Sequence, residues 1–238
     1  MKKTQLFLLH FAGGNRYSFQ FMAPFLKDFE VIALELPGRG MRVNENLLKD
    51  FELAAQDIYN QITNRLTSPK FVIYGHSMGA YLALRVSNML EKIDKSPAYL
   101  FVSGNSGPGN SDRKNRFLLE NDDFLEEVKK LGGISDEFIE NKELLEFFVP
   151  ILKADFEIAE KNEIEMESAI QAPLHAMMGS EEEKVEEISN WGRFTKSNFS
   201  YEILKGDHFF INNHPEKIAH IIKSHYDKTV VLRHQFNT

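Results

Sequence analysis

The chain has no cysteine among its 238 residues, so it can form no disulfide and has neither a cysteine nucleophile nor a thiolate metal site. It also lacks an apolar run of 18 residues, which a membrane-spanning helix requires. The short apolar stretch at 6–9 is interrupted by His10 and has no small-residue cleavage site after it, so it indicates a strand and not a signal peptide. We therefore expect a cytoplasmic protein with no membrane partner.

Basic residues are fewer than acidic ones in this chain. The 28 lysines and arginines are outnumbered by 35 aspartates and glutamates, which gives a net charge of −7. A field of this sign argues against nucleic-acid binding, and an acidic protein partner would need a local basic patch. Hydrophobic residues make up 42% of the chain, which is enough for a sizeable core, so we expect residues 1–238 to form one α/β domain.

Apolar segments of strand length alternate with helix-like segments along most of the chain. The expected strands are 5–11, 29–36, 71–74, 98–102, 174–178 and 199–204. The expected helices between them are 17–25, 51–66, 80–90, 185–194 and 215–226. This alternation predicts a mostly parallel, doubly wound sheet with its active site beyond the carboxyl ends of the strands. Residues 227–238 receive no assignment.

The alternation is broken once, between about residues 107 and 165, where no strand is expected. A stretch rich in glycine, proline and serine at 106–111 predicts a flexible hinge. The helical patterns that follow are 117–131, 136–139 and 142–159. A Gly-Gly pair separates the first two, and Pro150 predicts a kink or interruption in the third. This insertion indicates a helical lid over the site, and an ordinary helical subdomain packed on the sheet is the alternative.

The most informative motif is Gly-His-Ser-Met-Gly at residues 75–79. It follows the predicted strand at 71–74 and precedes the predicted helix at 80–90. Strand, tight turn and helix are the context of a nucleophile elbow, in which the glycines avoid collisions and the serine hydroxyl projects above the sheet. We therefore identify Ser77 as the candidate nucleophile, with an ordinary structural turn as the alternative.

A serine nucleophile needs a base. In enzymes that carry the serine on such an elbow, the order along the chain is serine, then acid, then histidine. The later histidines are His208, His214, His220, His225 and His234. Two of them, His220 and His225, lie in a helical pattern, and His214 precedes a proline as a helix cap does. His208 follows the last predicted strand, and a loop leaving the carboxyl end of that strand can reach Ser77. We expect His208 to be the base.

The third member of such a triad is a carboxylate, which is expected after the strand 174–178, but no aspartate occurs there. The residues there are Glu181, Glu182 and Glu183. A cluster of this kind is often the solvated start of a helix, yet a glutamate orients the histidine in some triads. Asp207 is adjacent to His208 and is poorly directed toward its ring, and Asp155 in the inserted segment is expected to be structural.

The loop His-Phe-Ala-Gly-Gly at 10–14 follows the first predicted strand. In this kind of fold such a loop supplies one backbone N–H of an oxyanion hole, and the residue after the nucleophile supplies the second. The donors here would be Ala12 and Met78. A glycine-rich phosphate loop is the alternative, but the sequence has neither Gly-x-Gly-x-x-Gly nor a P-loop lysine.

Taken together, these motifs resemble the type II (external, editing) thioesterases of nonribosomal peptide and polyketide synthesis. The matching positions are 11–14, 37–42, 75–79, 103–104, 131–133, 150–156, 191, 195 and 206–210. The resemblance implies an α/β-hydrolase fold and hydrolysis of acyl groups from the phosphopantetheine arm of acyl or peptidyl carrier proteins. It implies no metal and no cofactor, since the phosphopantetheine belongs to the substrate.

The sequence departs from that family at two positions. The family usually has an aspartate two or three residues beyond a glycine that matches Gly179, and this register gives the acid position to Glu182. It also favours proline before the oxyanion loop, where this chain has His10. Neither change disables the expected mechanism.

Other functions share these residues. A carboxylesterase or lipase would use the same triad on oxygen esters, and small thioesters such as acyl-coenzyme A are further candidate substrates. An integral, chain-releasing thioesterase domain is another reading, although the absence of a carrier domain favours a free-standing enzyme. A catalytically impaired hydrolase that only binds a carrier protein is the alternative from another class, and the missing aspartate keeps it open.

Overall fold

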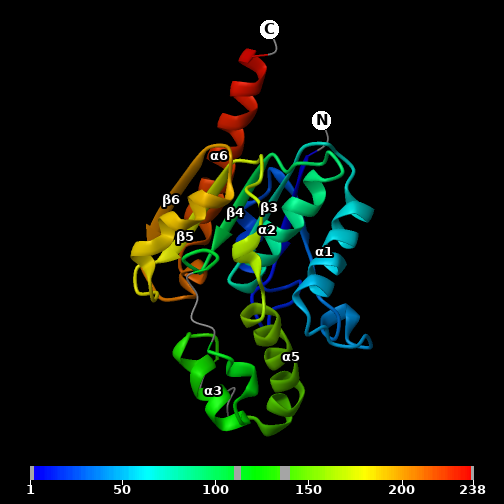
Figure 1. The fold of residues 1–238 in the computed structure, drawn as a ribbon, viewed down its shortest axis with the longest axis vertical. Coiled ribbons are helices and arrows are strands. Elements are labelled where there is room, and N and C mark those ends of the chain that lie inside the picture. Colours follow the sequence, from blue (N-terminus) through cyan, green and yellow to red (C-terminus); the bar gives the residue numbers. More distant parts are fainter. Residues whose placement is uncertain (1–2, 110–113, 135–139, 237–238) are drawn as a thin grey trace.

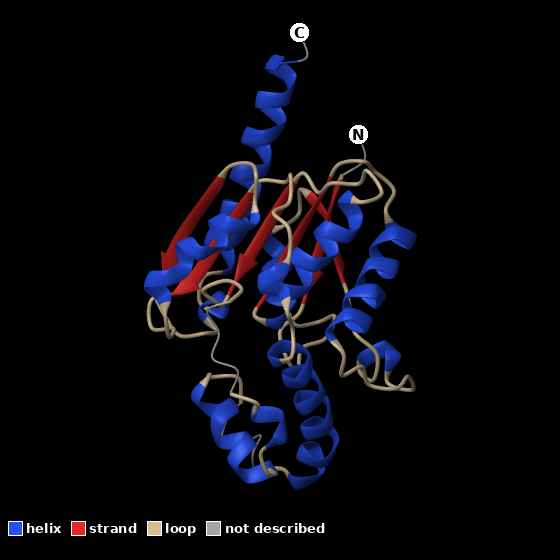
Figure 2. Ribbon diagram, viewed as in Figure 1, coloured by secondary structure: helices blue, strands red, loops and turns tan. Residues whose placement is uncertain are grey.

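The strands form one parallel sheet in a computed structural model that describes residues 3–109, 114–134 and 140–236 (Figures 1 and 2). The six strands are β1 (Thr4–Leu9), β2 (Phe29–Ala33), β3 (Phe71–His76), β4 (Tyr99–Ser103), β5 (Leu174–Gly179) and β6 (Phe199–Leu204). They lie in the order β2-β1-β3-β4-β5-β6, and every neighbouring pair is parallel. The predicted parallel, doubly wound sheet is confirmed.

The direction of winding reverses between β1 and β3, which pair with Leu9 opposite Gly75. Ligand sites of open α/β sheets lie at such a reversal, outside the carboxyl ends of the strands. The loop after β1 and the turn after β3 therefore start side by side at the place where a site is expected.

Helices cover both faces of the sheet (Figure 1). They are α1 (Phe51–Arg65), α2 (Met78–Glu91), α3 (Asn121–Lys130), α5 (Lys142–Glu160) and α6 (Pro215–Phe236). Short 3₁₀ helices are η1 (Gln20–Phe25), η2 (Gly40–Arg42), η3 (Arg116–Leu118), η4 (Ile164–Met166), η5 (Val185–Phe194) and η6 (Phe210–Asn212). Helices α1 and α2 pack on one face and α6 packs on the other.

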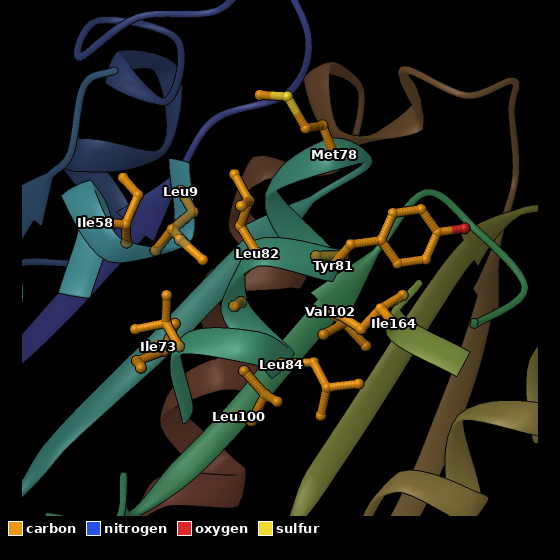
Figure 3. Close-up of a cluster of buried hydrophobic side chains, with 14 of the residues drawn as sticks. Leu9, Ile58, Ile73, Met78, Tyr81, Leu82, Leu84, Leu100, Val102 and Ile164 are labelled. Carbon is orange, nitrogen blue, oxygen red and sulfur yellow. The ribbon is translucent and has the colours of Figure 1, made fainter. Parts of the chain in front are cut away.

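The alternation of side chains along β1 shows how the two faces become two cores. Phe7 and Leu9 join one buried cluster with α1 and α2, whereas Leu6 and Leu8 join a second cluster with α6. Figure 3 shows part of the first cluster, where strand residues such as Ile73 and Leu100 lie beside Leu82 and Leu84 of α2. Burial on both faces explains why the strands are apolar almost throughout.

Helices η3, α3 and α5 form a separate group beyond the carboxyl ends of the strands (Figure 2). This helical group has a third core of its own. Its buried members are Phe124, Leu125, Val128, Val149, Leu152 and Phe156. No strand occurs in the described part of the predicted insertion. Of the predicted features, the helix at 136–139 and part of the hinge at 106–111 lie outside the described residues.

Four sequence-based expectations are corrected. Pro150 does not interrupt its helix, because α5 continues from Lys142 to Glu160 with Val149, Leu152 and Phe156 anchored in the third core. Burial on both sides of the proline compensates for the one helical hydrogen bond that it removes. The final helix continues into the unassigned tail and ends at Phe236.

The two remaining corrections concern element type and length. The segments 17–25 and 185–194 contain 3₁₀ helices, η1 and η5, in place of the α-helices that we expected. Strands β1 and β2 end at Leu9 and Ala33, earlier than expected, because the chain turns there into the loops beyond the sheet.

Candidate active site

Ser77 occupies a sharp turn between β3 and α2. Its backbone has φ 57° and ψ −118°, a conformation that costs energy for any residue with a side chain. A Cβ added at Gly75 would come within 2.1 Å of the Gly79 carbonyl oxygen, and one at Gly79 within 2.3 Å of the Leu9 carbonyl oxygen. The collisions predicted for both glycines are confirmed, and they explain why the turn holds the serine in this position.

The turn brings Ser77 to the two side chains expected to assist it. His208 Nε2 lies 2.9 Å from Ser77 Oγ, and His208 Nδ1 lies 2.8 Å from Glu182 Oε2. Glu182 Oε1 accepts the Gly179 N–H at 2.7 Å, which fixes the carboxylate from its other side. The serine follows β3, the glutamate follows β5 and the histidine follows β6. Three loops at one end of the sheet thus assemble a continuous hydrogen-bonded relay.

The other carboxylates considered from the sequence lie elsewhere. Glu183 is 82% exposed and pairs with Lys114, and Glu181 is also exposed. Asp207 accepts the N–H of Phe209 at 2.8 Å and so shapes its own loop. Among the three neighbouring glutamates, the structure brings Glu182 to the histidine.

The other histidines have different partners. His214 Nε2 lies 2.7 Å from the Lys205 carbonyl oxygen, and His220 is exposed on α6. His225 lies against His175 with their ring centres 4.5 Å apart, away from the elbow. The side chain of His234 lies outside the described part of the structure.

A polar network beside the relay was not foreseen from the sequence. Ser103 Oγ lies 2.8 Å from both Tyr74 Oη and His76 Nδ1, and the His76 ring centre lies 5.1 Å from that of His208. Burial, and then the neighbouring His208, lower the pKa of His76 well below its usual value, so His76 is neutral. The strand periodicity alone makes these residues resemble ordinary core.

The loop at 10–14 lies beside the elbow. The Phe11 carbonyl accepts the Gly14 N–H at 2.9 Å and the His10 Nδ1–H at 2.8 Å, which closes a tight turn around Ala12. Burial, and then Arg39, lower the pKa of His10 to about 4, so this imidazole is neutral. Within residues 3–109, 114–134 and 140–236, no acceptor contacts the Ala12 N–H. Met78 begins α2, where a backbone N–H has no helical partner.

Two cavities meet at Ser77, Ala12 and His208. The first measures about 420 Å³ and has an apolar wall. That wall includes Phe11, Val128, Leu131, Phe148, Leu152, Phe156 and Phe209. The second measures about 300 Å³ and is lined by charged and polar groups that include Arg116, Lys130, Glu160 and Asn105.

Two kinds of feature are absent from the described residues. Nowhere in that part of the chain do three or more His, Asp or Glu side chains gather in a way that could hold a metal ion. Of the helices in the same ranges, none has the length and apolar character needed to cross a bilayer.

Comparison with known proteins places this geometry in a family. The Thioesterase domain family matches residues 4–226. The chain is 29% identical to the gramicidin S biosynthesis protein GrsT of Aneurinibacillus migulanus over 214 residues, which cover 88% of this chain and 83% of that protein. It is 27% identical to thioesterase PikA5 of Streptomyces venezuelae over 221 residues, covering 92% and 79% of the two chains.

Solved structures agree with the sequence matches. ClbQ from the colibactin NRPS/PKS pathway superimposes with a TM-score of 0.89 at 25% identity, covering 97% of this chain and 100% of that chain. The type II thioesterase YbtT from the yersiniabactin NRPS/PKS pathway superimposes with a TM-score of 0.86 at 25% identity, covering 96% and 94%. The expected α/β-hydrolase fold is confirmed, and the chain belongs to the thioesterase domain family of hydrolases.

Proposed function

We propose that this enzyme hydrolyses acyl groups, including stalled or aberrant ones, from the phosphopantetheine arm of acyl or peptidyl carrier proteins. The observation that carries the proposal is the hydrogen-bonded chain from Glu182 through His208 to Ser77, set where an apolar cavity meets one that also carries charged and polar groups. Relatives named for gramicidin S, colibactin and yersiniabactin biosynthesis support a synthase carrier domain as the partner.

The first half-reaction forms an acyl-enzyme. His208 Nε2 takes the proton of the Ser77 hydroxyl while Oγ attacks the thioester carbonyl carbon. The N–H groups of Ala12 and Met78 stabilise the oxyanion that develops. When the tetrahedral intermediate collapses, the C–S bond breaks and the leaving thiolate takes the proton from His208, so the pantetheine thiol departs and the acyl group stays on Ser77.

The second half-reaction releases the acid. His208 takes a proton from a water molecule that attacks the acyl carbon, and the proton then passes to Ser77 Oγ as the C–O bond to the serine breaks. Glu182 accepts the Nδ1–H of His208 in both halves, which favours the tautomer with a free Nε2 and stabilises the imidazolium when it forms. The phosphopantetheine belongs to the substrate, so none of these steps calls for a dissociable cofactor or a metal.

The two cavities suggest how the substrate divides between them. The apolar cavity suits the acyl chain, because its burial there removes hydrocarbon from water. The second cavity, which carries charged and polar groups beside apolar ones, suits the amide-rich arm, and its Arg116 and Lys130 are paired with Glu160 and Glu127. We place the helical group of η3, α3 and α5 over the site as its lid, since residues of α3 and α5 line both cavities.

The glutamate also bears on the alternative of an impaired, carrier-binding homologue. A relay with both contacts of His208 below 3 Å supports a working enzyme, because a dead homologue has no need to keep it.

The experiment that tests the function compares the same acyl group on a carrier protein, on coenzyme A and in an oxygen ester. We expect the highest kcat/KM for the carrier protein and the lowest for the oxygen ester. Preference for the oxygen ester would instead indicate a carboxylesterase.

A further inference from the structure

Two segments noted in the sequence, 37–42 and 150–156, have no role in the mechanism above, yet the structure joins them in a buried ion pair. Arg39 Nη1 lies 2.5 Å from Asp155 Oδ2, and Arg39 Nη2 lies 2.8 Å from Asp155 Oδ1. The Arg39 side chain is 4% exposed and the Asp155 side chain 0%. A bidentate pair of this kind fixes both the orientation and the separation of the two side chains.

The turn that carries Arg39 is shaped by glycine on both sides. Gly38 and Gly40 have φ values of +82° and +49°. A Cβ at Gly40 would lie 2.1 Å from Glu35 Oε1, and Glu35 is held in turn by the N–H groups of Arg16 and Met41. The chain can therefore direct the guanidinium inward only with glycine at these positions.

The pair also holds the loop at 10–14. Asp155 Oδ2 accepts the Gly13 N–H at 2.7 Å, and Arg39 Nη1 donates to the Gly14 carbonyl at 3.3 Å. Gly13 has φ +76°, and a Cβ there would meet Leu152 of α5 at 2.5 Å. The ion pair and α5 thus fix the two residues that follow Ala12.

We propose that Asp155 and Arg39 are positioning residues that aim the Ala12 N–H at the oxyanion by holding Gly13 and Gly14. This inference rests on the proposed function, because it takes Ala12 to be an oxyanion donor. Stability alone is a poor reason for the pair, since the desolvation of two buried charges offsets much of their attraction. A small displacement of an oxyanion donor, by contrast, is costly to the rate.

The test uses Asp155→Asn, with Asp57→Asn as its control. Asp57 of α1 makes a bidentate pair with Arg42, at 2.7 and 2.8 Å, in a more exposed setting where Arg42 also pairs with Glu45, and it does not contact the loop at 10–14. We measure the rate of Ser77 labelling by a fluorophosphonate, together with kcat and KM for an acyl-pantetheine thioester. For Asp155→Asn we expect labelling and kcat to fall by about 10- to 100-fold with KM nearly unchanged, and for Asp57→Asn we expect both rates to stay within about twofold.

Asp155→Asn leaves the Arg39 charge without its partner, so a second variant is used in case the first does not fold. The double variant Arg39→Met with Asp155→Leu replaces the pair by apolar groups, which buried sites often tolerate. It should fold, as checked by its thermal transition, and still label slowly because nothing accepts the Gly13 N–H. Wild-type labelling rates in the folded double variant, or equal losses in Asp155→Asn and Asp57→Asn, would overturn the proposal.

The two readouts keep this inference separate from the proposed function. A wild-type enzyme that labels at Ser77 but hydrolyses no thioester contradicts the proposed function, and the labelling rates of the variants still decide the role of Asp155. A wild-type enzyme that does not label contradicts both.

Discussion

Glu182 Oε2 lies 2.8 Å from His208 Nδ1, where the resemblance noted in the sequence implies an aspartate as the usual acid. The extra methylene of glutamate is accommodated because Oε1 is tied to the backbone N–H of Gly179 at 2.7 Å. The side chain therefore folds back toward the end of its own strand before it reaches the ring. The longer residue therefore contacts the ring and the Gly179 N–H at the same time.

The first prediction tests this contact. Glu182→Gln keeps the size but places an amide against His208 Nδ1, which favours the wrong tautomer, and we expect kcat to fall by roughly 10²–10⁴-fold. Glu182→Asp should be intermediate, because the shorter side chain reaches either the ring or Gly179 but not both. Steady-state kinetics with one thioester substrate measure both variants.

The control for this series is Glu183→Gln. Glu183 is 82% exposed and pairs with Lys114, so its loss should change kcat by less than about twofold. If Glu183→Gln is the costly change and Glu182→Gln is silent, the acid has been assigned to the wrong residue.

Much of this site could be predicted from the sequence because its parts are local. The elbow glycines, the serine between them and the histidine after the last strand each follow from the short-range pattern of a strand, a turn and a helix. Topology does the rest, since parallel strands bring their carboxyl ends together. The acid could also be narrowed to three adjacent glutamates, the register from Gly179 favours Glu182 among them, and the contact with His208 agrees with that choice.

Features that depend on distant parts of the chain could not be predicted in the same way. Arg39 and Asp155 are 116 residues apart, and although both lie in segments noted in the sequence, nothing in the sequence near either residue predicts that they pair. The network of Tyr74, His76 and Ser103 likewise resembles core in a strand pattern. Pro150 shows the reverse error, because a strong local signal for a break was overridden by burial of the residues around it.

The second prediction concerns acyl-chain length. Val128→Phe adds bulk to the apolar cavity and should prevent the end of a long acyl chain from being buried. If about three methylenes lose their burial, the loss is about 2 kcal/mol, or roughly 30-fold in kcat/KM. Decanoyl- and acetyl-pantetheine are compared, and we expect the loss for decanoyl with little change for acetyl. Equal losses for both substrates would show that the acyl chain does not bind in this cavity.

The third prediction concerns acid stability and comes from His175 in the sheet. Burial, and then His225, lower the pKa of His175 to about 3. The unfolded chain therefore binds a proton that the folded chain does not, so stability is full above the ordinary histidine pKa near 6.5 and declines as the pH falls through it. His10, with its pKa lowered to about 4, acts in the same direction. We expect the free energy of unfolding to decline between pH 6.5 and 5.

Urea unfolding of His175→Phe across this pH range checks the sign. Removal of this one histidine should reduce the slope of the free energy of unfolding against pH by up to about 1.4 kcal/mol per pH unit. A steeper slope in His175→Phe would mean that the imidazole is charged in the folded protein.

The central claim is that Ser77 carries the acyl group between the two half-reactions. Intact-mass and peptide mass spectrometry after rapid mixing with an acyl-loaded carrier protein measures this most directly. We expect the wild-type enzyme to gain the acyl mass on the peptide that contains Ser77 and to free the carrier thiol. Ser77→Ala should remain folded, gain no acyl mass and lose on the order of 10³-fold or more in turnover. Hydrolysis by Ser77→Ala at near wild-type rates, or an acyl group on another residue, would contradict the account.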